Sequence, residues 1–430
     1  MTRLAFPDYP DLCGWNALLA KRAPKPRAEG AMAVKYAVVG AGYTGVAAAR
    51  RLAELDPHAE IVVLEASDVG EGSAARNSGF ASPRDIPATA SEAEQRHTAA
   101  LNRFGEEGFG WLVGLMAEHG IDCGLERTGR LKGAATAAGA RVVEGLRASA
   151  RDLGVPHDYL DAAGMERRMG SRYYGCGLYT EEGHLLQPAA LIRGLADSLP
   201  PSVRLFEHSP VRALRRDTKW RLATEDASIT AECVVLATNA AVKQFGYLRD
   251  RLVSIYTYAA ITEAMAPQDA AQLGGMANWG LLPSHRLGTT LRRVGPDRLM
   301  VRSLYAYEQG LDARRVQETL RACFHRRYPD LRHVGLDYVW GGTTALTMNG
   351  APWWGKLDDG LYASAGCNGA GIVKGTVLGK RLAEHITGHG THADVGATYG
   401  SASRLVPEPF RRIGFTIVSA IGRRKAGREA

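Results

Sequence analysis

The chain contains, from position 38 to position 45, the sequence Val38-Val39-Gly40-Ala41-Gly42-Tyr43-Thr44-Gly45. The apolar residues before it predict a buried parallel strand over 36–39, and the alanine-rich residues after it predict a helix over 46–55. Gly40 would turn the chain, Gly42 would let backbone approach a ligand without a Cβ, and Gly45 would let helix and strand pack closely. The pattern predicts a strand–turn–helix unit whose helix N-terminus faces the pyrophosphate of a dinucleotide.

A second apolar run, Ile61-Val62-Val63-Leu64, ends in an acid, Glu65, twenty residues after Gly45. A carboxylate there would accept hydrogen bonds from the ribose of the adenosine half and would disfavour a 2′-phosphate. A glycine turn without a ligand is the alternative, because a chain with 50 glycines produces accidental matches. The ordered context of strand, glycines, helix, strand and acid favours the dinucleotide.

The composition is that of a globular protein large enough for two connected domains, with 430 residues, 45% hydrophobic and 23% charged. No apolar run reaches the roughly 18 residues that span a bilayer, and the first ten residues lack an apolar signal core. We therefore expect a cytoplasmic protein. The six cysteines show no CxxC pair and no histidine at metal-ligand spacing, so we predict neither a metal site nor a disulfide framework.

The net charge is +8, from 53 Lys+Arg against 45 Asp+Glu. Nucleic-acid binding is one interpretation, but the basic residues are spread along the chain and no nucleic-acid-binding motif accompanies them. A solvated basic surface that steers an anionic substrate is favoured.

The last segment, the basic tail 401–430, has a different pattern. Residues 410–425 are apolar in the middle and basic at both ends. Such a segment could touch a membrane surface or a partner protein. Its internal glycines and short apolar face favour the other alternative, a tail helix docked on the protein body.

The dinucleotide-binding elements are distributed over the chain. We predict an α/β protein: a discontinuous Rossmann-like FAD-binding domain and a second α+β substrate domain built on a mostly antiparallel sheet. A nicotinamide dehydrogenase usually keeps its cofactor domain in one block, so this interleaving favours a flavin that lies across both domains. The expected division is an N-terminal extension 1–33, a cofactor domain 34–88, 185–246 and 335–400, a substrate domain 89–184 and 247–334, and the tail 401–430.

Four blocks occur together between about residues 34 and 387: 39–45 with 64–66, the loop 72–80, the run 236–240, and 340–342 leading through Pro352 to 366–371. In this combination the chain resembles the FAD-dependent amine and amino-acid oxidoreductases of the D-amino-acid oxidase superfamily. Within it the chain is most similar to the γ-glutamylputrescine oxidase-like branch, with sarcosine oxidases as more distant relatives.

The resemblance implies that these blocks bind FAD. Arg76 would supply positive charge beside the pyrophosphate and flavin, with a surface arginine as the alternative, and Val211 would offer backbone to the adenine. The turn at 369–371 would aim amides and a helix dipole at the flavin pyrimidine. The implied FAD-binding residues are Gly40, Gly42, Tyr43, Thr44, Gly45, Glu65, Ala66, Ser73, Ala74, Arg76, Asn77, Ser78, Val211, Ala237, Thr238, Gly341, Gly366, Asn368, Gly369, Ala370, Gly371 and Ile372.

The chain also departs from its relatives. Sarcosine oxidases attach the flavin through a cysteine in the segment corresponding to 342–344, and this chain has none there, so we expect non-covalent FAD. Those enzymes also place an oxygen-activating lysine over the flavin, at a position that corresponds to Arg292 here. An arginine could favour superoxide or bind a substrate carboxylate, but the change puts oxidase activity in question.

The implied reaction is oxidation of a C–N bond in a small amine or amino-acid derivative, such as a γ-glutamyl amine, an N-methyl amino acid, a D-amino acid or an opine. Hydride would pass to flavin N5, the imine would be hydrolysed to a carbonyl compound and an amine, and oxygen would reoxidise the flavin. The candidate catalytic residues are Arg292 and His285, with a structural role as the alternative for each.

Three rival functions remain. A nicotinamide-dependent dehydrogenase would leave the loop 72–80 and the turn 366–371 unexplained. An amine dehydrogenase would pass electrons to a quinone or a protein, with the basic tail as the docking element. A non-catalytic flavoprotein subunit would bind FAD without being reduced by any amine.

Overall fold

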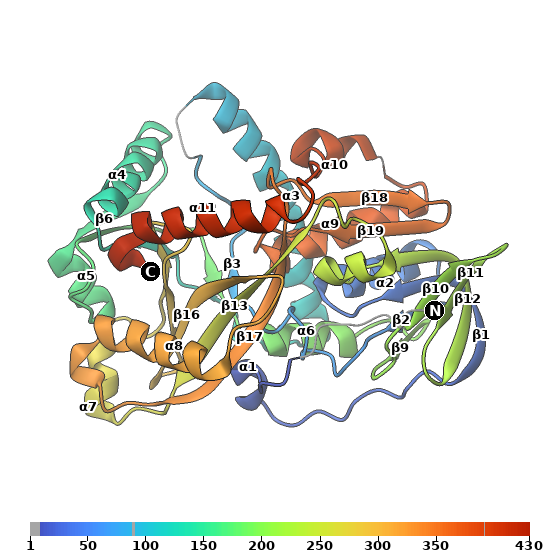
Figure 1. Ribbon diagram of the computed structural model, residues 1–430, viewed down its shortest axis with the longest axis horizontal. Coiled ribbons are helices and arrows are strands. Elements are labelled where there is room, and N and C mark those ends of the chain that lie inside the picture. The colour runs from blue at the N-terminus through green and yellow to red at the C-terminus, as the bar shows by residue number, and fades with distance from the viewer. Residues whose placement is uncertain (1–8, 88–90, 391) are drawn as a thin grey trace.

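The computed structural model describes residues 9–87, 91–390 and 392–430, which form two large sheets with helices around them (Figure 1). The first sheet has β1 (Gly30–Val39) at its centre, paired in parallel with β2 (Ile61–Leu64) and β12 (Ala227–Leu236). The other strands of this sheet are β9 (Val203–Phe206), β10 (Ala213–Arg216), β11 (Trp220–Ala223), β18 (Trp353–Asp358) and β19 (Leu361–Ala365).

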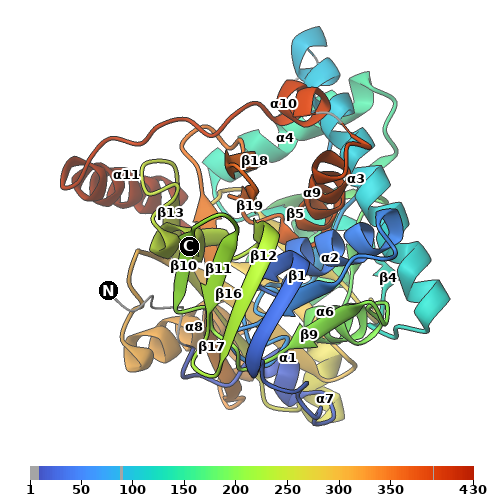
Figure 2. The ribbon, with the colours of Figure 1, turned by 90° about the vertical axis from the view of Figure 1, so that its right-hand side faces the viewer.

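Strand β1 is apolar on both sides because both faces of this sheet are covered. Val38 joins a core shared with helices α2 (Tyr43–Leu55) and α9 (Gly371–Ile386), whereas Ala37 and Val39 join a second core on the opposite face. Figure 2 shows α2 and α9 lying side by side over the sheet, together with α3 (Glu92–His119). The strand begins at Gly30, so the expected N-terminal extension 1–33 already includes its start.

Glycines set the distance between the elements of the first sheet. Gly40 has a positive φ of 100°, which permits the turn that follows β1. A Cβ on Gly45 would lie 1.8 Å from the Gly40 carbonyl oxygen, and a Cβ on Gly379 would lie 2.2 Å from the Thr44 carbonyl oxygen. Helix α2 is therefore held against both β1 and α9 at distances that only glycine allows.

The second sheet is built mainly from antiparallel pairs. Its strand order is β17-β13-β16-β15-β14-β5-β7-β6, and only the pair β14–β5 is parallel among the described residues. Helix α8 (Ala313–Arg327) packs Val316, Leu320 and Phe324 on one face of it. The strands are β5 (Arg130–Ala134), β6 (His157–Asp161), β7 (Cys176–Thr180), β13 (Val253–Thr262), β14 (Gly280–Pro283), β15 (Thr290–Val294), β16 (Arg298–Tyr307) and β17 (Leu336–Leu346).

The predicted fold class, α/β with a Rossmann-like sheet and a mostly antiparallel second sheet, is confirmed. Several boundaries differ from the expected ones. Strand β17 pairs with β13 in the second sheet, although the sequence placed all of 335–400 in the cofactor domain. The helix expected from 46 begins at Tyr43. Residues 1–8 of the expected extension, the expected domain boundary at 88–89 and residue 391 lie outside the described residues.

Shorter elements complete the molecule. A small sheet joins β3 (Phe80–Ala81), β8 (His184–Leu185) and β4 (Glu126–Arg127). Within the described ranges, no helix combines the length and apolarity needed to cross a bilayer. The remaining helices are α1 (Gly14–Ala17), α4 (Ala137–Asp152), α5 (Ala162–Met169), α6 (Pro188–Asp197), α7 (Pro267–Ala270), α10 (His392–Tyr399) and α11 (Phe410–Ala426).

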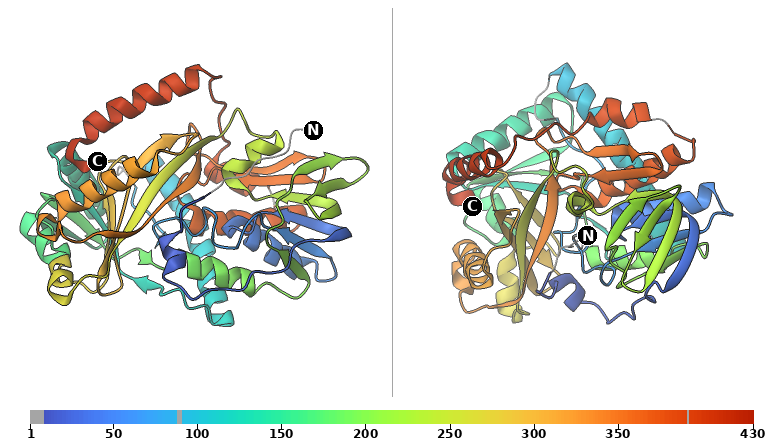
Figure 3. Two further views of the ribbon diagram at one scale, coloured as in Figure 1. Left: turned by 60° about the horizontal axis from the view of Figure 1, so that its bottom comes forward. Right: turned by 45° about the vertical axis from the view of Figure 1, so that its right-hand side comes forward.

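The C-terminal segment is docked on the protein body, as one of the two sequence-based alternatives stated. The side chain of Glu429 is buried and accepts a hydrogen bond from the Ala135 amide at 2.7 Å. Arg327 donates to the Glu429 carbonyl oxygen at 3.0 Å. The end of the chain is thereby fixed to β5, α4 and α8, and α11 lies across the second sheet (Figure 3, left).

Substituting Gly379→Ala tests the close contact between α9 and α2. We expect a loss of about 2–3 kcal/mol of unfolding free energy, because the new Cβ would meet backbone that cannot move away. Gly114→Ala in α3 is the matched control, since nothing lies within 4 Å of a Cβ there. It should stabilise the protein by about 0.5–1 kcal/mol. Urea denaturation measures both, and equal stability of the two variants would contradict the packing argument.

Candidate active site

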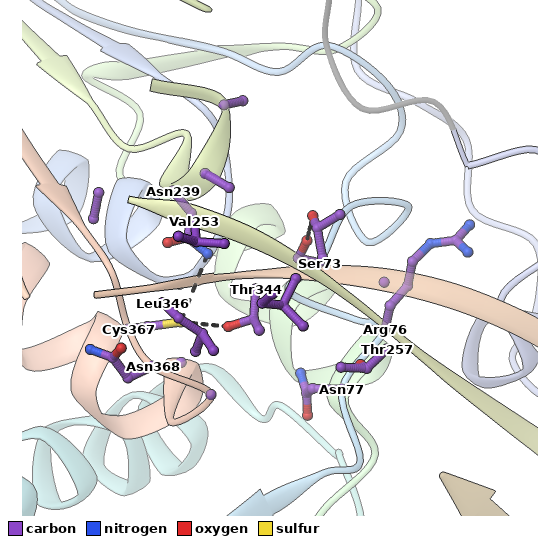
Figure 4. A pocket seen from close by; sticks show the side chains of 18 of the residues that line it. Ser73, Arg76, Asn77, Asn239, Val253, Thr257, Thr344, Leu346, Cys367 and Asn368 are labelled. Carbon is purple, nitrogen blue, oxygen red and sulfur yellow. Dashed lines mark hydrogen bonds between the residues drawn. The ribbon is translucent and has the colours of Figure 1, made fainter. Parts of the chain in front are cut away.

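A single large cavity of about 1470 Å³ is lined by residues from both sheets. It exceeds the roughly 300–1,000 Å³ of an ordinary small-molecule pocket. One end is formed by the loops after β1, β2 and β12, and the other by strands β13, β15 and β16 together with α11. Figure 4 shows the middle of it, where side chains from the loop after β2, from β13 and β17 and from the turn before α9 face one another. A cavity of this size and origin can hold a dinucleotide and a small substrate.

The glycine turn after β1 forms part of one wall of the cavity. Gly40, Gly42, Tyr43 and Thr44 line it, and the first intrahelical bond of α2 runs from the Val46 amide to the Gly42 carbonyl at 2.9 Å. The amides of the first helical turn have no intrahelical acceptor, so they form an anion site at the positive end of the helix. Gly45 does not line the cavity and has the packing role already described.

Glu65 lines the cavity at the end of β2, as the sequence predicted for a ribose acceptor. One carboxylate oxygen accepts from the Ala41 amide at 2.8 Å, and the other accepts from the amides of Ala66 and Ser67 at 2.8 and 3.3 Å. Burial raises the pKa of the Glu65 carboxyl, and the three amide donors oppose that shift. Two carboxylate oxygens can accept about four hydrogen bonds, so capacity remains for a ribose hydroxyl.

The loop after β2 is anchored by Arg76, whose side chain is 1% exposed. Its guanidinium donates to the carbonyl oxygens of Glu71, Gly341 and Asp11 at 2.7, 3.0 and 2.8 Å. Arg76 is therefore not the surface arginine of the alternative interpretation. It also pairs with the Glu71 carboxylate at 3.2 Å, and it joins the loop to β17 and to the N-terminal segment.

The N-terminal segment contributes a side chain that the sequence did not identify. The Tyr9 hydroxyl lies 2.9 Å from Ser73 Oγ and 2.6 Å from Thr343 Oγ1, and these two oxygens are 3.0 Å apart. The Arg76 guanidinium lies over the Tyr9 ring, 4.5 Å from its centroid. No periodicity or motif marks Tyr9, because its position depends on how the segment crosses the cavity.

The turn before α9 closes the middle of the cavity (Figure 4). Asn368 has a positive φ of 53°, and its side-chain oxygen accepts from the Thr347 amide at 2.9 Å. The Cys367 sulfur lies 3.6 Å from Thr344 Oγ1 and 3.8 Å from Asn239 Nδ2. Gly371 and Ile372, the first residues of α9, line the cavity. The positive end of a second helix is thus directed into the same space.

Two buried polar atoms in the wall lack a partner. Thr238 Oγ1 and Gln244 Oε1 form no hydrogen bond with any described residue, although both side chains line the cavity near the end of β12. Unpaired buried polar atoms are costly. A bound ligand with ribose and base hydrogen-bonding groups would satisfy them.

Most residues predicted to bind the cofactor lie together in this wall. Gly45, Gly341, Gly366 and Ala370 do not line it. The predicted residues that line it are Gly40, Gly42, Tyr43, Thr44, Glu65, Ala66, Ser73, Ala74, Arg76, Asn77, Ser78, Val211, Ala237, Thr238, Asn368, Gly369, Gly371 and Ile372.

The end of the cavity formed by the second sheet is basic. His285 lines it, as predicted, and its Nδ1 accepts from the Leu287 amide at 3.2 Å. Arg302 also lines it and donates to the Tyr305 hydroxyl at 3.0 Å. The sequence reasoning missed Arg302, because its place in the cavity depends on the pairing of β16 with β13 and β15, which puts it opposite Ala259 and Thr290.

Arg292 does not line the cavity, which corrects its expected place as a substrate or oxygen contact. Its side chain is buried, stacks on Trp15 with 4.8 Å to the ring centroid, and donates to the carbonyl oxygens of Ser78 and Leu186 at 3.0 and 2.6 Å. Burial lowers the pKa of Arg292 to about 10, so it remains a cation at neutral pH. Arg292 therefore supports the loop 72–80 from the side away from the cavity, because its guanidinium points toward these carbonyls.

A glycine turn, an acid after the second strand, two helix N-termini and unpaired polar atoms around one cavity define a dinucleotide-binding protein of the α/β class. A family model described as FAD dependent oxidoreductase matches residues 35–385. The chain therefore belongs to this family of FAD-dependent oxidoreductases, and FAD, as predicted, is the cofactor that the cavity wall fits.

Individual relatives agree with this assignment. The chain is 27% identical to gamma-glutamylputrescine oxidoreductase of Escherichia coli (strain K12) over 384 residues, covering 88% of this chain and 89% of that protein. Its fold is similar to that of glycine oxidase from Geobacillus kaustophilus, with a TM-score of 0.72, 20% identity, and coverage of 87% and 100% of the two chains. It is also similar to L-proline dehydrogenase from P. horikoshii, with a TM-score of 0.67, 17% identity, and coverage of 88% and 98%.

Glu65→Gln tests the ribose contact. The amide loses the negative charge and one acceptor oxygen, so we expect FAD affinity to fall by roughly tenfold or more, the value of a charge-assisted hydrogen bond. Glu60→Gln is the control, because Glu60 lies at the surface, where it pairs with Arg204. Fluorescence titration of the apoprotein with FAD measures the affinity, and wild-type affinity of the Glu65 variant would remove this residue from the site.

Arg292→Met tests whether this arginine supports the loop or contacts the substrate. We expect the free energy of unfolding to fall by about 2 kcal/mol, since two charged hydrogen bonds to carbonyls are lost. KM for the substrate should change by no more than about twofold, because the loss of a charged contact with the substrate would change KM much more. A large rise in KM at unchanged stability would restore the catalytic assignment.

Proposed function

We propose that this enzyme oxidises the C–N bond of a small amine or amino-acid derivative that carries a carboxylate, with the carboxylate held by Arg302. The observation that supports this most is the distribution of charge along the cavity. Its acidic lining residues, Glu65 and Glu71, belong to the loops of the first sheet. The opposite end is lined by His285 and by four basic residues, Arg286, Arg302, Arg411 and Lys425.

Arg302 is the best placed of these residues because it lies on the central strand β16, between β13 and β15. Its described hydrogen bond goes to the neutral hydroxyl of Tyr305, and it forms no ion pair with a carboxylate of the described residues. Tyr305 in turn donates to the Arg286 carbonyl at 2.8 Å, which fixes the ring beside the arginine. A cation held in this way can bind an anionic group in two-pronged geometry.

The relatives favour the same class of substrate. Gamma-glutamylputrescine, glycine and L-proline, the compounds for which these relatives are named, each combine an amine or amide nitrogen with a carboxylate. Bound FAD supplies the hydride acceptor for the C–H bond next to the substrate nitrogen. The chain supplies position: Arg302 holds the carboxylate, and the walls of β13 and β17 keep the reacting carbon at a fixed distance from the cofactor side.

We propose that FAD is bound without a covalent link to the protein. Segment 342–344 of β17 lines the cavity with a glycine and two threonines, and Cys367, the cysteine in the lining, lies in the turn before α9. We propose oxygen as the electron acceptor, with an amine dehydrogenase that uses another acceptor as the alternative.

An anaerobic absorbance titration tests the reaction. The purified holoprotein is titrated with γ-glutamyl amines, N-methyl amino acids, D-amino acids and opines, and air is then admitted. Bleaching of the flavin band by a carboxylate-bearing amine supports the proposal, and fast recolouring in air identifies an oxidase. Slow recolouring identifies a dehydrogenase, and a flavin that none of these amines bleaches would support the non-catalytic alternative.

Matched variants locate the carboxylate contact in the same assay. Arg302→Met should raise the KM of the carboxylate-bearing substrate by about 10- to 100-fold, equivalent to one charge-assisted hydrogen bond, while its amide analogue changes little. Arg302→Lys should recover part of the loss because it keeps the charge but not the planar fork. An equal effect on substrate and amide analogue would show that Arg302 does not bind the carboxylate.

A further inference from the structure

Helix α11 presents an unusually apolar face to solvent. Five large hydrophobic side chains on this helix are exposed: Phe410 68%, Ile413 51%, Ile417 54%, Val418 68% and Ile421 49%. Residues 410, 413, 417 and 421 follow one another at spacings of three and four, so they share one side of the helix. In a water-soluble helix this side would carry polar residues.

The helix carries Ile413 and Ile417 on its outer side, whereas its exposed Phe410, Val418 and Ile421 line the cavity. Its inner side contacts the protein body through Phe415, whose ring lies 4.9 Å from that of Tyr307, and through Arg423, which donates to the Tyr305 carbonyl at 3.3 Å. Arg411 donates to the Arg249 carbonyl at 3.2 Å, and Glu429 fixes the segment that follows. The left view of Figure 3 shows α11 as the outermost element on its side of the molecule. The apolar face is therefore exposed by the fold and not by detachment of the tail.

The charges on α11 indicate what covers that face. Residues 410–426 contain five basic residues and no acid: Arg411 and Arg412 at the start, and Arg423, Arg424 and Lys425 at the end. An apolar middle between two basic ends is the pattern of a helix that lies in the interface of a membrane with anionic headgroups. Arg411 and Arg423 contact the protein body, and Arg411 and Lys425 line the cavity. Arg424 is exposed and can reach lipid phosphates, while the other basic residues add to the positive field of the helix.

The apolar face continues to the rim of the cavity. Met348 and Val406 are 63% and 47% exposed, and both line the cavity together with Phe410, Val418 and Ile421 of α11. We call Met348, Val406, Phe410, Ile413, Ile417, Val418 and Ile421 the α11 patch. The patch thus joins the outer face of the helix to the opening of the active site.

We propose that the α11 patch docks this enzyme on an anionic phospholipid bilayer, with the rim of the cavity turned toward the lipid. A second copy of the chain would have to cover five basic residues with an equally basic helix, which like-charge repulsion disfavours. A bilayer satisfies both the apolar strip and the charges. The proposal concerns the outer face of α11 and does not depend on which substrate the enzyme oxidises.

Vesicle flotation tests the proposal on the FAD-loaded protein. Wild-type protein should float with phosphatidylcholine vesicles that contain about 30 mol% phosphatidylglycerol and remain at the bottom with phosphatidylcholine alone, because the anionic lipid attracts the basic ends. Binding should fall as salt rises toward 1 M, where the screening length is about 3 Å.

A double variant and a single variant separate the apolar and basic contributions. Ile413→Asp with Ile417→Asp should reduce vesicle binding by at least roughly tenfold, and Arg424→Gln should reduce it about fivefold. Val113→Asp with Val142→Asp, at exposed apolar positions on α3 and α4, is the matched control and should bind like wild type. The ratio of flavin to protein absorbance shows that each variant is folded.

Three results would overturn the proposal. The wild type could fail to float with anionic vesicles, or the Ile413/Ile417 variant could float as well as the wild type. Alternatively, light scattering without lipid could show a dimer that the Ile413/Ile417 variant loses, in which case a second copy of the chain covers the patch.

Discussion

The close approach of helix α2 to β1 and α9 is the constraint on which the rest of the structure depends. Gly45 and Gly379 remove the Cβ atoms that would otherwise meet the Gly40 and Thr44 carbonyl oxygens at 1.8 and 2.2 Å. Because this contact is made by backbone, it fixes where the first turns of both helices point. Their positive ends then converge on one cavity, so the packing of three elements creates the electrostatics of the cofactor site.

The two ends of the cavity are lined by different chemical groups. The first sheet supplies Glu65, helix amides and the unpaired oxygens of Thr238 and Gln244, which suit the polar groups of FAD. The second sheet supplies Arg302 beside a neutral Tyr305, which suits an anion. A cofactor lying across both sheets would bring its reactive part close to the basic end. In the proposed function, this division of charge separates cofactor recognition from substrate recognition within one continuous space.

Arginine side chains of the same type have different roles because of their surroundings. The guanidinium groups of Arg76 and Arg292 donate hydrogen bonds to backbone carbonyls, and they hold the loop after β2 from two sides. Arg302 keeps most of its donors free at the cavity surface. The N-terminal segment takes part in the same support, since Tyr9 bridges Ser73 and Thr343 while Trp15 stacks on Arg292. A segment without sequence periodicity therefore stiffens the site.

The sequence by itself determined the α/β class, the glycine turn, the acid at Glu65, the loop around Arg76 and the turn before α9, because each depends on a local pattern with its own backbone requirement. Only the tertiary structure decided that β17 joins the second sheet, that Arg292 lies behind the loop, and that Arg302 and Tyr9 face the cavity. The orientation of α11 was decided there too. These outcomes depend on which distant segments pack together, and a linear pattern contains no information about which side of a neighbouring element a residue will meet.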